Sequence, residues 1–286
     1  MNAPTEHSKP LNMSNGDASI FPAAYRILPS ELSGTYKILG EYAAALRTIA
    51  DHPALDMSRK EAQLKILAQA IGSTQGLDTQ DTAVRSALAL HHVLQNRGLD
   101  IQDAGQMLQA ADQDIHKISY PDWSDLLAWC RFWAAPIGRI AFSLAKGGEQ
   151  GQAKAESFAI AVQILHLVEQ APAQYRWLGR VYLPTRWFRE AGSDVSELTG
   201  VISTDGLNRV FAHALGEARQ LLDASAGFYR HLPTRRLRIA GATAQCEAYA
   251  WAHVLGRADI LIGARRLNGI NRLIVSLTGF LRGLIS

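Results

Sequence analysis

The densest group of residues able to do chemistry lies between positions 120 and 139, where the sequence reads YPDWSDLLAWCRFWAAPIGR. This stretch has helical spacing but carries Pro136 in its middle, and a proline there removes a backbone hydrogen bond and kinks a helix. The small residues Ala134, Ala135 and Gly138 beside the kink let another object approach the backbone closely. That object is either a neighbouring helix or a ligand, and the pattern by itself favours the helix.

Familiar site motifs are absent from the sequence. It holds no Gly-rich phosphate loop, no H-E-x-x-H, no G-x-S-x-G and no EF-hand loop. Its nine histidines are scattered, and the adjacent His91 and His92 would point about 100° apart on a helix. The only cysteines are Cys130 and Cys246, which excludes a disulfide framework and a zinc site built from cysteine pairs. We therefore predict a protein of the reducing cytoplasm without a nucleotide loop or a histidine metal site.

The elements that must position chemical residues are predicted to be helices. Apolar residues recur at spacings of three and four, no run alternates with period two, and residues 179–184 (GRVYLP) read as an extended connection closed by a proline. Residues 1–19 lack an apolar stretch and are interpreted as a disordered tail before a single all-α domain over residues 20–286. No window is apolar enough for a transmembrane helix. The predicted helices span residues 31–51, 58–73, 79–98, 102–117, 121–145, 152–171, 206–226, 234–256 and 258–284.

The overall charge of +3 is unevenly distributed. Residues 227–286 hold nine arginines against Glu247 and Asp259, a net charge of +7, which leaves 3 − 7 = −4 for the rest of the chain. Such a surplus favours a phosphate-bearing partner or an anionic membrane. Residues 270–284 fit either a helix on the inner surface of a membrane or the last core helix, and we favour the core helix. Nucleic acid is not an expected partner, because the basic stretch carries no recognition motif.

Several ordered motifs resemble one enzyme family. The stretch from position 120 to 139 resembles the Y-x-D-W-x-D-L-x-x-Y-C-x-x-S-A-x-P-V-G-R signature of bacterial squalene and phytoene synthases, especially the hydroxysqualene synthase branch of hopanoid biosynthesis. Trp129 stands at the usual tyrosine and Trp133 at the usual serine. The resemblance covers about residues 20–280. Further matches, in order, are Phe21-Pro22, Leu28-Pro29, Ile49-Ala50-Asp51, Gln113-Asp114 with Lys117 and Tyr120, Gln163-Ile164-Leu165, Tyr175-Arg176, residues 180–184 and residues 235–238.

The resemblance implies a fold and a chemistry. The fold is an isoprenoid-synthase-type helical bundle around a central apolar cavity, and the ligand is a prenyl or presqualene diphosphate. In active members two D-x-x-x-D motifs on facing helices hold Mg²⁺, which clamps the diphosphate leaving group. Carboxylates at positions i and i+4 share one helix face, and magnesium prefers oxygen ligands and neutralises the departing charge.

Site residues follow from the same resemblance. The catalytic residues it implies are Asp51, Asp114 and Tyr120, and Asp51 is also the remaining candidate for a metal ligand. The matching substrate-binding positions are Arg47, Lys117, Cys130, Ala134, Pro136, Gly138, Gln163, His166, Gln170, Gln174, Arg180 and Tyr182.

The chain departs from the family pattern at the metal motifs. Residues 46–51 read LRTIAD where the family has A-D-D-I-A-D, so Arg47 stands at the leading acid. The second motif, usually N-x-x-x-D-x-x-x-D, reads His166, Gln170 and Gln174, and Pro172 is expected to break its helix. One carboxylate of four remains, which predicts that magnesium binding is weakened or lost. Arg47 would oppose a metal ion but could attract a diphosphate directly.

The surviving acids also have structural interpretations. Asp51 could simply end its helix before a proline, and Asp114 with Lys117 could form an i,i+3 surface pair. Both interpretations stay open beside the functional ones.

The leading functional hypothesis is a diverged member of triterpenoid metabolism that binds an isoprenoid diphosphate or a triterpenoid, with impaired or absent magnesium-dependent catalysis. It would be cytoplasmic, or peripheral at the inner membrane face, and could form a hetero-oligomer with an active enzyme of the pathway. Two alternatives stay open: an active enzyme converting presqualene diphosphate to hydroxysqualene or squalene, and a non-catalytic assembly protein. A cavity filled by Trp129, Trp133 and Trp177 would favour the assembly role.

Overall fold

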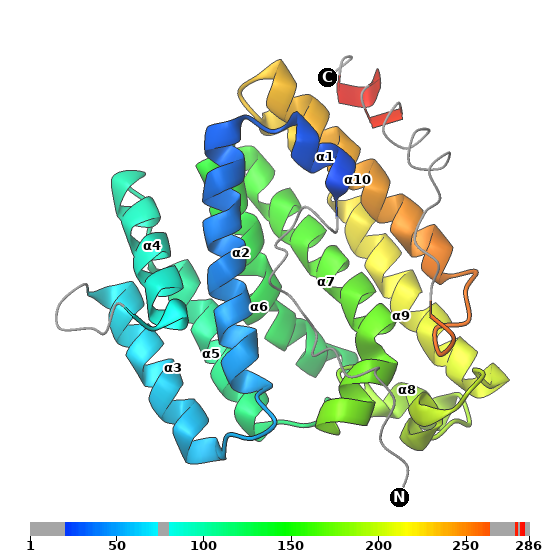
Figure 1. Cartoon of the computed structure of the whole chain (residues 1–286). Coiled ribbons are helices and arrows are strands. Elements are labelled where there is room, and N and C mark those ends of the chain that lie inside the picture. The colour runs from blue at the N-terminus through cyan, green and yellow to red at the C-terminus, as the bar shows by residue number, and fades with distance from the viewer. Residues whose placement is uncertain (1–20, 74–79, 264–277, 280, 284–286) are drawn as a thin grey trace, which may run out of the picture.

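The computed structural model describes residues 21–73, 80–263, 278–279 and 281–283, and every regular element in this part of the chain is a helix (Figure 1). A single parallel bridge pairs Ser119 with Val181. The helices are α1 (Pro22–Ile27), α2 (Ser30–Ala50), α3 (Met57–Gly72), α4 (Thr82–Asn96), α5 (Gln102–His116), α6 (Trp123–Leu144), α7 (Glu149–Leu178), α8 (Thr185–Glu190), α9 (Asp205–Ala224) and α10 (Arg235–Leu255), with short 3₁₀ turns at Val195–Thr199 and Phe228–His231.

Most predicted helices are confirmed, and their ends have local causes. The carboxylates of Asp56 and Asp81 accept backbone N–H groups at the starts of α3 and α4, and the hydroxyls of Thr204 and Thr234 do the same for α9 and α10. Gly179 adopts a left-handed conformation, with φ of 62°, directly after α7. It turns the chain into the extended segment predicted at residues 179–184.

Two predictions about helices were wrong, and two short helices were not predicted. Pro172 does not break α7, which continues to Leu178 because its packing between α6 and α9 offsets the lost backbone hydrogen bond. The six-residue helices α1 and α8 are too short for the periodicity to reveal. The helix predicted from residue 258 does not begin there, since residues 258–263 form turns. Residues 264–277 of that prediction, and the predicted tail at residues 1–19, lie outside the described residues.

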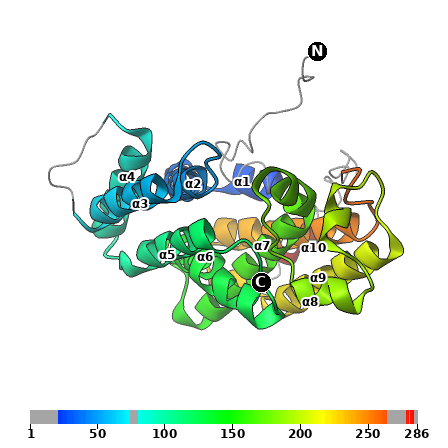
Figure 2. The same cartoon turned by 90° about the horizontal axis from the view of Figure 1, so that it is seen from below.

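The helices pack in two layers around α6 and α7. Figure 2 shows α2 and α3 lying over α5 and α6, and α7 runs between α6 and α9. Gly138 is where α6 and α7 come closest: a Cβ added there would lie 2.8 Å from the Ala155 carbonyl oxygen and 2.9 Å from the Ala159 Cβ. The close approach expected beside Pro136 is therefore, at Gly138, that of a neighbouring helix.

The first and the last described segments both pack on α10. The Glu247 carboxylate of α10 accepts the backbone N–H groups of Ala23 and Ala24 in α1, each at 3.1 Å. Near the C-terminus, Cβ atoms added at Gly279 and Gly283 would both lie 2.5 Å from backbone atoms of α10. The described part of the C-terminal segment thus packs on the bundle, as the core-helix interpretation expected. Among the described helices, none combines the length and apolar character needed to cross a membrane.

Candidate functional site

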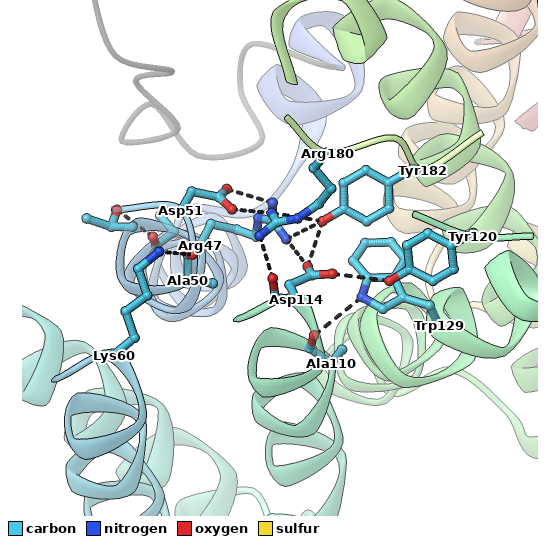
Figure 3. Close-up of polar contacts among 12 residues, drawn as sticks. Arg47, Ala50, Asp51, Lys60, Ala110, Asp114, Tyr120, Trp129, Arg180 and Tyr182 are labelled. Atoms are coloured by element: carbon cyan, nitrogen blue, oxygen red, sulfur yellow. Dashed lines mark hydrogen bonds and ion pairs between the residues drawn. The ribbon is translucent and has the colours of Figure 1, made fainter. Parts of the chain in front are cut away.

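The candidate site forms where three segments meet (Figure 3). The C-terminal end of α2 brings Arg47 and Asp51, the end of α5 brings Asp114, and the extended segment after α7 brings Arg180 and Tyr182. The Ser119–Val181 bridge fixes that segment against the connection between α5 and α6. All five residues were predicted from the sequence, and the structure brings them into direct contact.

Arg47 is the centre of this group, and its side chain is only 9% exposed. Its Nη2 donates to Asp51 Oδ2 at 2.6 Å, and its Nη1 donates to Tyr182 Oη at 2.9 Å and to the Asp114 carboxylate. The guanidinium carbon also lies 5.5 Å from the centre of the Trp133 ring. Burial opposes the charge, but Asp51, Tyr182 and Asp114 together hold the pKa of Arg47 well above its ordinary value. Arg47 is therefore a permanent cation whose terminal nitrogens are already engaged.

Asp114 is fully buried and accepts three side-chain donors. Besides Arg47, the Tyr182 hydroxyl donates to its Oδ2 at 2.6 Å and the Tyr120 hydroxyl to its Oδ1 at 3.2 Å. Burial raises the pKa of the Asp114 carboxyl, while Arg47, Arg180 and Tyr182 favour its charged form. The interpretation of Asp114 as half of a surface pair with Lys117 was therefore wrong.

Arg180 forms the second bridge of the site. Its Nη1 donates to Asp51 Oδ1 at 2.5 Å, and its Nη2 donates to the Asp114 carbonyl oxygen at 2.5 Å. Its Nε is buried and has no hydrogen-bond partner within the described residues. Asp51 does end α2, as the structural interpretation expected, and it also joins two guanidinium groups.

Two lysines flank this network. Lys117 places its ammonium 4.3 Å from the centre of the Tyr120 ring, so it contacts the site through the aromatic face. Lys60 of α3, which sequence reasoning missed, donates to the Ala50 carbonyl oxygen at 3.0 Å. Burial and then the Arg180 charge lower the pKa of Lys60. Its only sequence signal was its position at the start of the helix after Asp51.

The α7 positions of the second metal motif carry no acid. His166, Gln170 and Gln174 follow one another at four-residue spacing, with Gln174 buried and the other two partly buried, as is Gln163. Burial, followed by the Arg47 charge, lowers the pKa of His166 to about 4. His166 therefore faces the network as a neutral imidazole at neutral pH.

Two aromatic residues of α6, Trp129 and Trp133, pack against the network. The Trp129 and Trp133 rings stack at 6.0 Å, and Trp129 Nε1 donates to the Ala110 carbonyl oxygen at 3.3 Å. Trp177, by contrast, is 61% exposed, so it fills no interior space. Cys130, like Ala134 and Pro136, is buried in this helix. Burial raises the pKa of the Cys130 thiol, which keeps it protonated and unsuited to nucleophilic attack.

The residues present do not fit a magnesium site. Among residues 21–73, 80–263, 278–279 and 281–283, no three His, Cys, Asp or Glu side chains are grouped so that they could hold a metal ion. The two acids that do approach one another, Asp51 and Asp114, are joined by guanidinium groups. Glutamine side chains at positions 170 and 174 offer neutral oxygens only.

Comparisons with known proteins agree on one family. The sequence profile of squalene/phytoene synthase matches residues 15–266. A hydroxysqualene synthase from Zymomonas mobilis is 24% identical over 243 residues, covering 84% of this chain and 80% of that protein. A hydroxysqualene synthase from Rhodopseudomonas palustris is 31% identical over 151 residues, covering 52% of this chain and 49% of that protein.

Solved structures support the same fold. The squalene synthase HpnC from Alicyclobacillus acidocaldarius superimposes with a TM-score of 0.69 at 19% identity, covering 86% of this chain and 91% of the other. A dehydrosqualene synthase solved in complex with a ligand gives a TM-score of 0.72 at 18% identity, covering 92% and 91%. These similarities identify the isoprenoid-synthase-type helical bundle that the sequence predicted.

Proposed function

The chain belongs to the squalene/phytoene synthase family, and on that premise we propose that it binds an isoprenoid diphosphate in triterpenoid biosynthesis with impaired or absent magnesium-dependent catalysis. The related hydroxysqualene synthases support the ligand class and the hydroxysqualene synthase branch. The altered metal motifs support the loss of catalysis.

One observation carries the catalytic part of this proposal. Arg47 stands where the first motif should begin, and it joins the two acids, Asp51 and Asp114, that remain near the site. A metal-assisted ionisation draws several kcal/mol of transition-state stabilisation from the ion, and each 1.36 kcal/mol is about tenfold in rate. Without ligands for that ion, ionisation of the diphosphate is slowed by orders of magnitude.

The binding part of the proposal rests on the cations around the network. Arg180 has a buried Nε–H group without a partner in the described residues, and a buried unsatisfied donor is costly unless a ligand or water accepts from it. Lys60 donates to the carbonyl oxygen of Ala50, the residue before Asp51, and adds a third positive charge to a group with two acids. A diphosphate oxygen at Arg180 and Lys60 would satisfy both requirements.

The proposal is tested with presqualene diphosphate and the purified protein. Binding is measured by equilibrium dialysis with and without Mg²⁺, and the same mixtures are extracted for hydroxysqualene and squalene. We expect saturable binding independent of Mg²⁺, and no turnover. Lys60→Met should weaken binding about tenfold, the scale of one charge-assisted hydrogen bond. Lys65→Met, an exposed lysine on the same helix, is the matched control and should not change binding.

Other results of this experiment would each support one of the alternative functions. Turnover by the wild-type protein would contradict the loss of catalysis and identify an active synthase. Absence of both binding and turnover would contradict the ligand and favour an assembly role. Turnover that appears only when an active enzyme of the pathway is added would indicate that a hetero-oligomer supplies the missing carboxylates.

A further inference from the structure

Arg47 and Asp51 are one helical turn apart on α2, so both side chains reach the same point between α2 and α5. We infer that Arg47 is a built-in cation that takes the place of a divalent metal ion, so that the site is complete without magnesium. The inference rests on the proposed function only in taking the same site as the place where the ligand binds.

The contacts of Arg47 are those required of a bridging cation. Its guanidinium joins a carboxylate of α2, Asp51, to a carboxylate of α5, Asp114, through different nitrogen atoms. A planar guanidinium holds carboxylates in fixed directions, and unlike a metal ion it cannot dissociate. The packing of α2 on α5 at this point is therefore secured by the chain itself.

The carboxylate oxygens are all in use (Figure 3). Asp51 Oδ1 accepts from Arg180 and Oδ2 from Arg47, while Asp114 Oδ1 accepts from Tyr120 and Oδ2 from Arg47 and Tyr182. Magnesium requires several oxygen ligands in near-octahedral geometry. To bind here it would have to displace donors from both acids and approach two guanidinium groups of like charge.

A residue next to Arg47 also departs from the family signature. Trp133, which stands at a serine position of the family signature, places its ring 5.5 Å from the guanidinium carbon. Departures from the family pattern on α2 and α6 therefore contact one another, as expected if the site has been rebuilt for a guanidinium.

The test compares thermal unfolding at about 1 mM Mg²⁺ with unfolding in EDTA, with no isoprenoid present. The wild-type protein should unfold at the same temperature in both. Arg47→Asp restores an i,i+4 acid pair opposite Asp114, and its unfolding temperature should rise by about 3 °C or more when Mg²⁺ replaces EDTA. Arg97→Asp, made at the exposed Arg97–Glu31 pair, is the matched control and should show no such rise.

Arg47→Gln carries the test if the aspartate variant does not fold. It frees both carboxylates without adding a third, so a smaller magnesium-dependent rise is expected. The inference is overturned if wild type shows saturable stabilisation by Mg²⁺, or if folded Arg47 variants fail to respond. Because no diphosphate is present, these results are independent of whether presqualene diphosphate binds.

Discussion

Two clusters of oppositely charged side chains show how burial changes the contribution of an ion pair to stability. The buried network around Arg47 and the surface group around Arg186 each join one arginine to two acids. Arg186 donates to Glu190 at 2.7 Å, close to the 2.6 Å between Arg47 and Asp51, and lies 3.5 Å from Asp122. Its side chain, however, is 61% exposed, against 9% for Arg47.

The two clusters differ in whether water can solvate a charge once its partner has been removed. Arg186 lines an open hollow of about 510 Å³ together with Trp123 and Trp187, so water solvates its charge if an acid is removed. In the network, removing one partner leaves a charge in a region from which water is excluded. We therefore expect the ion pairs of the network to contribute more to the free energy of unfolding than those of the surface group.

Asp114→Ala should cause the largest loss of stability and is therefore the strongest test of this comparison. The substitution leaves Arg47 buried with one acid fewer and removes the acceptor of two tyrosine hydroxyls, so we expect a loss of about 3 to 5 kcal/mol in the free energy of unfolding. Urea unfolding at pH 7 measures it. Glu190→Ala, at the surface group, is the matched control. Equal losses in the two variants would show that burial does not separate them.

Tyr182→Phe should have the next largest effect. It removes a hydroxyl that donates to Asp114 at 2.6 Å and accepts from Arg47 at 2.9 Å, two hydrogen bonds to charged groups. We expect a loss of about 2 kcal/mol in the free energy of unfolding. Tyr120→Phe removes a single, longer bond of 3.2 Å and should lose less. The reverse order would mean that the Tyr120 hydroxyl contributes more to stability than its longer hydrogen bond to Asp114 indicates.

Much of this site could be predicted from the sequence because its residues lie in ordered motifs. Arg47, Asp51, Asp114, Arg180 and Tyr182 were all expected from the family resemblance. Their mutual contacts were not, since Arg47 meets a carboxylate 67 residues away and a hydroxyl 135 residues away. Local spacing shows which face of a helix a residue occupies, but it does not show which distant side chain fills the space opposite.

Tertiary packing also explains the errors in the fold. Pro172 has a low helix propensity, yet α7 continues through it because both neighbouring helices hold the buried side of that turn. Trp177, which the assembly alternative would place in the cavity with Trp129 and Trp133, is exposed near the end of α7. Propensity and residue type are local quantities, whereas both outcomes depend on what packs beside the helix.

The pH dependence of the free energy of unfolding gives a further test, through His166. Its pKa is about 4 in the folded protein against an ordinary value of 6.5, so the unfolded chain binds a proton first as the pH falls. Its contribution to stability is complete above pH 6.5 and is lost between pH 6.5 and 4, by about 2 kcal/mol. His166→Gln should flatten the stability curve in that range. A difference from wild type that is the same at pH 8 and pH 4.5 would contradict this origin.

Arg186→Ala is expected to have the smallest effect on thermal stability. A small effect is what distinguishes the exposed ion pairs from the buried ones. The Arg186 side chain gives up contacts to Glu190 and Asp122, but water takes over both acids, and exposed ion pairs contribute little net stability. We expect the thermal midpoint to shift by less than about 2 °C, and the shift to vanish in high salt because screening already weakens the pair. A large shift that persists in salt would instead indicate that Arg186 supports the stacked rings of Trp123 and Trp187, which lie 5.7 Å apart, so that packing rather than charge would explain its effect.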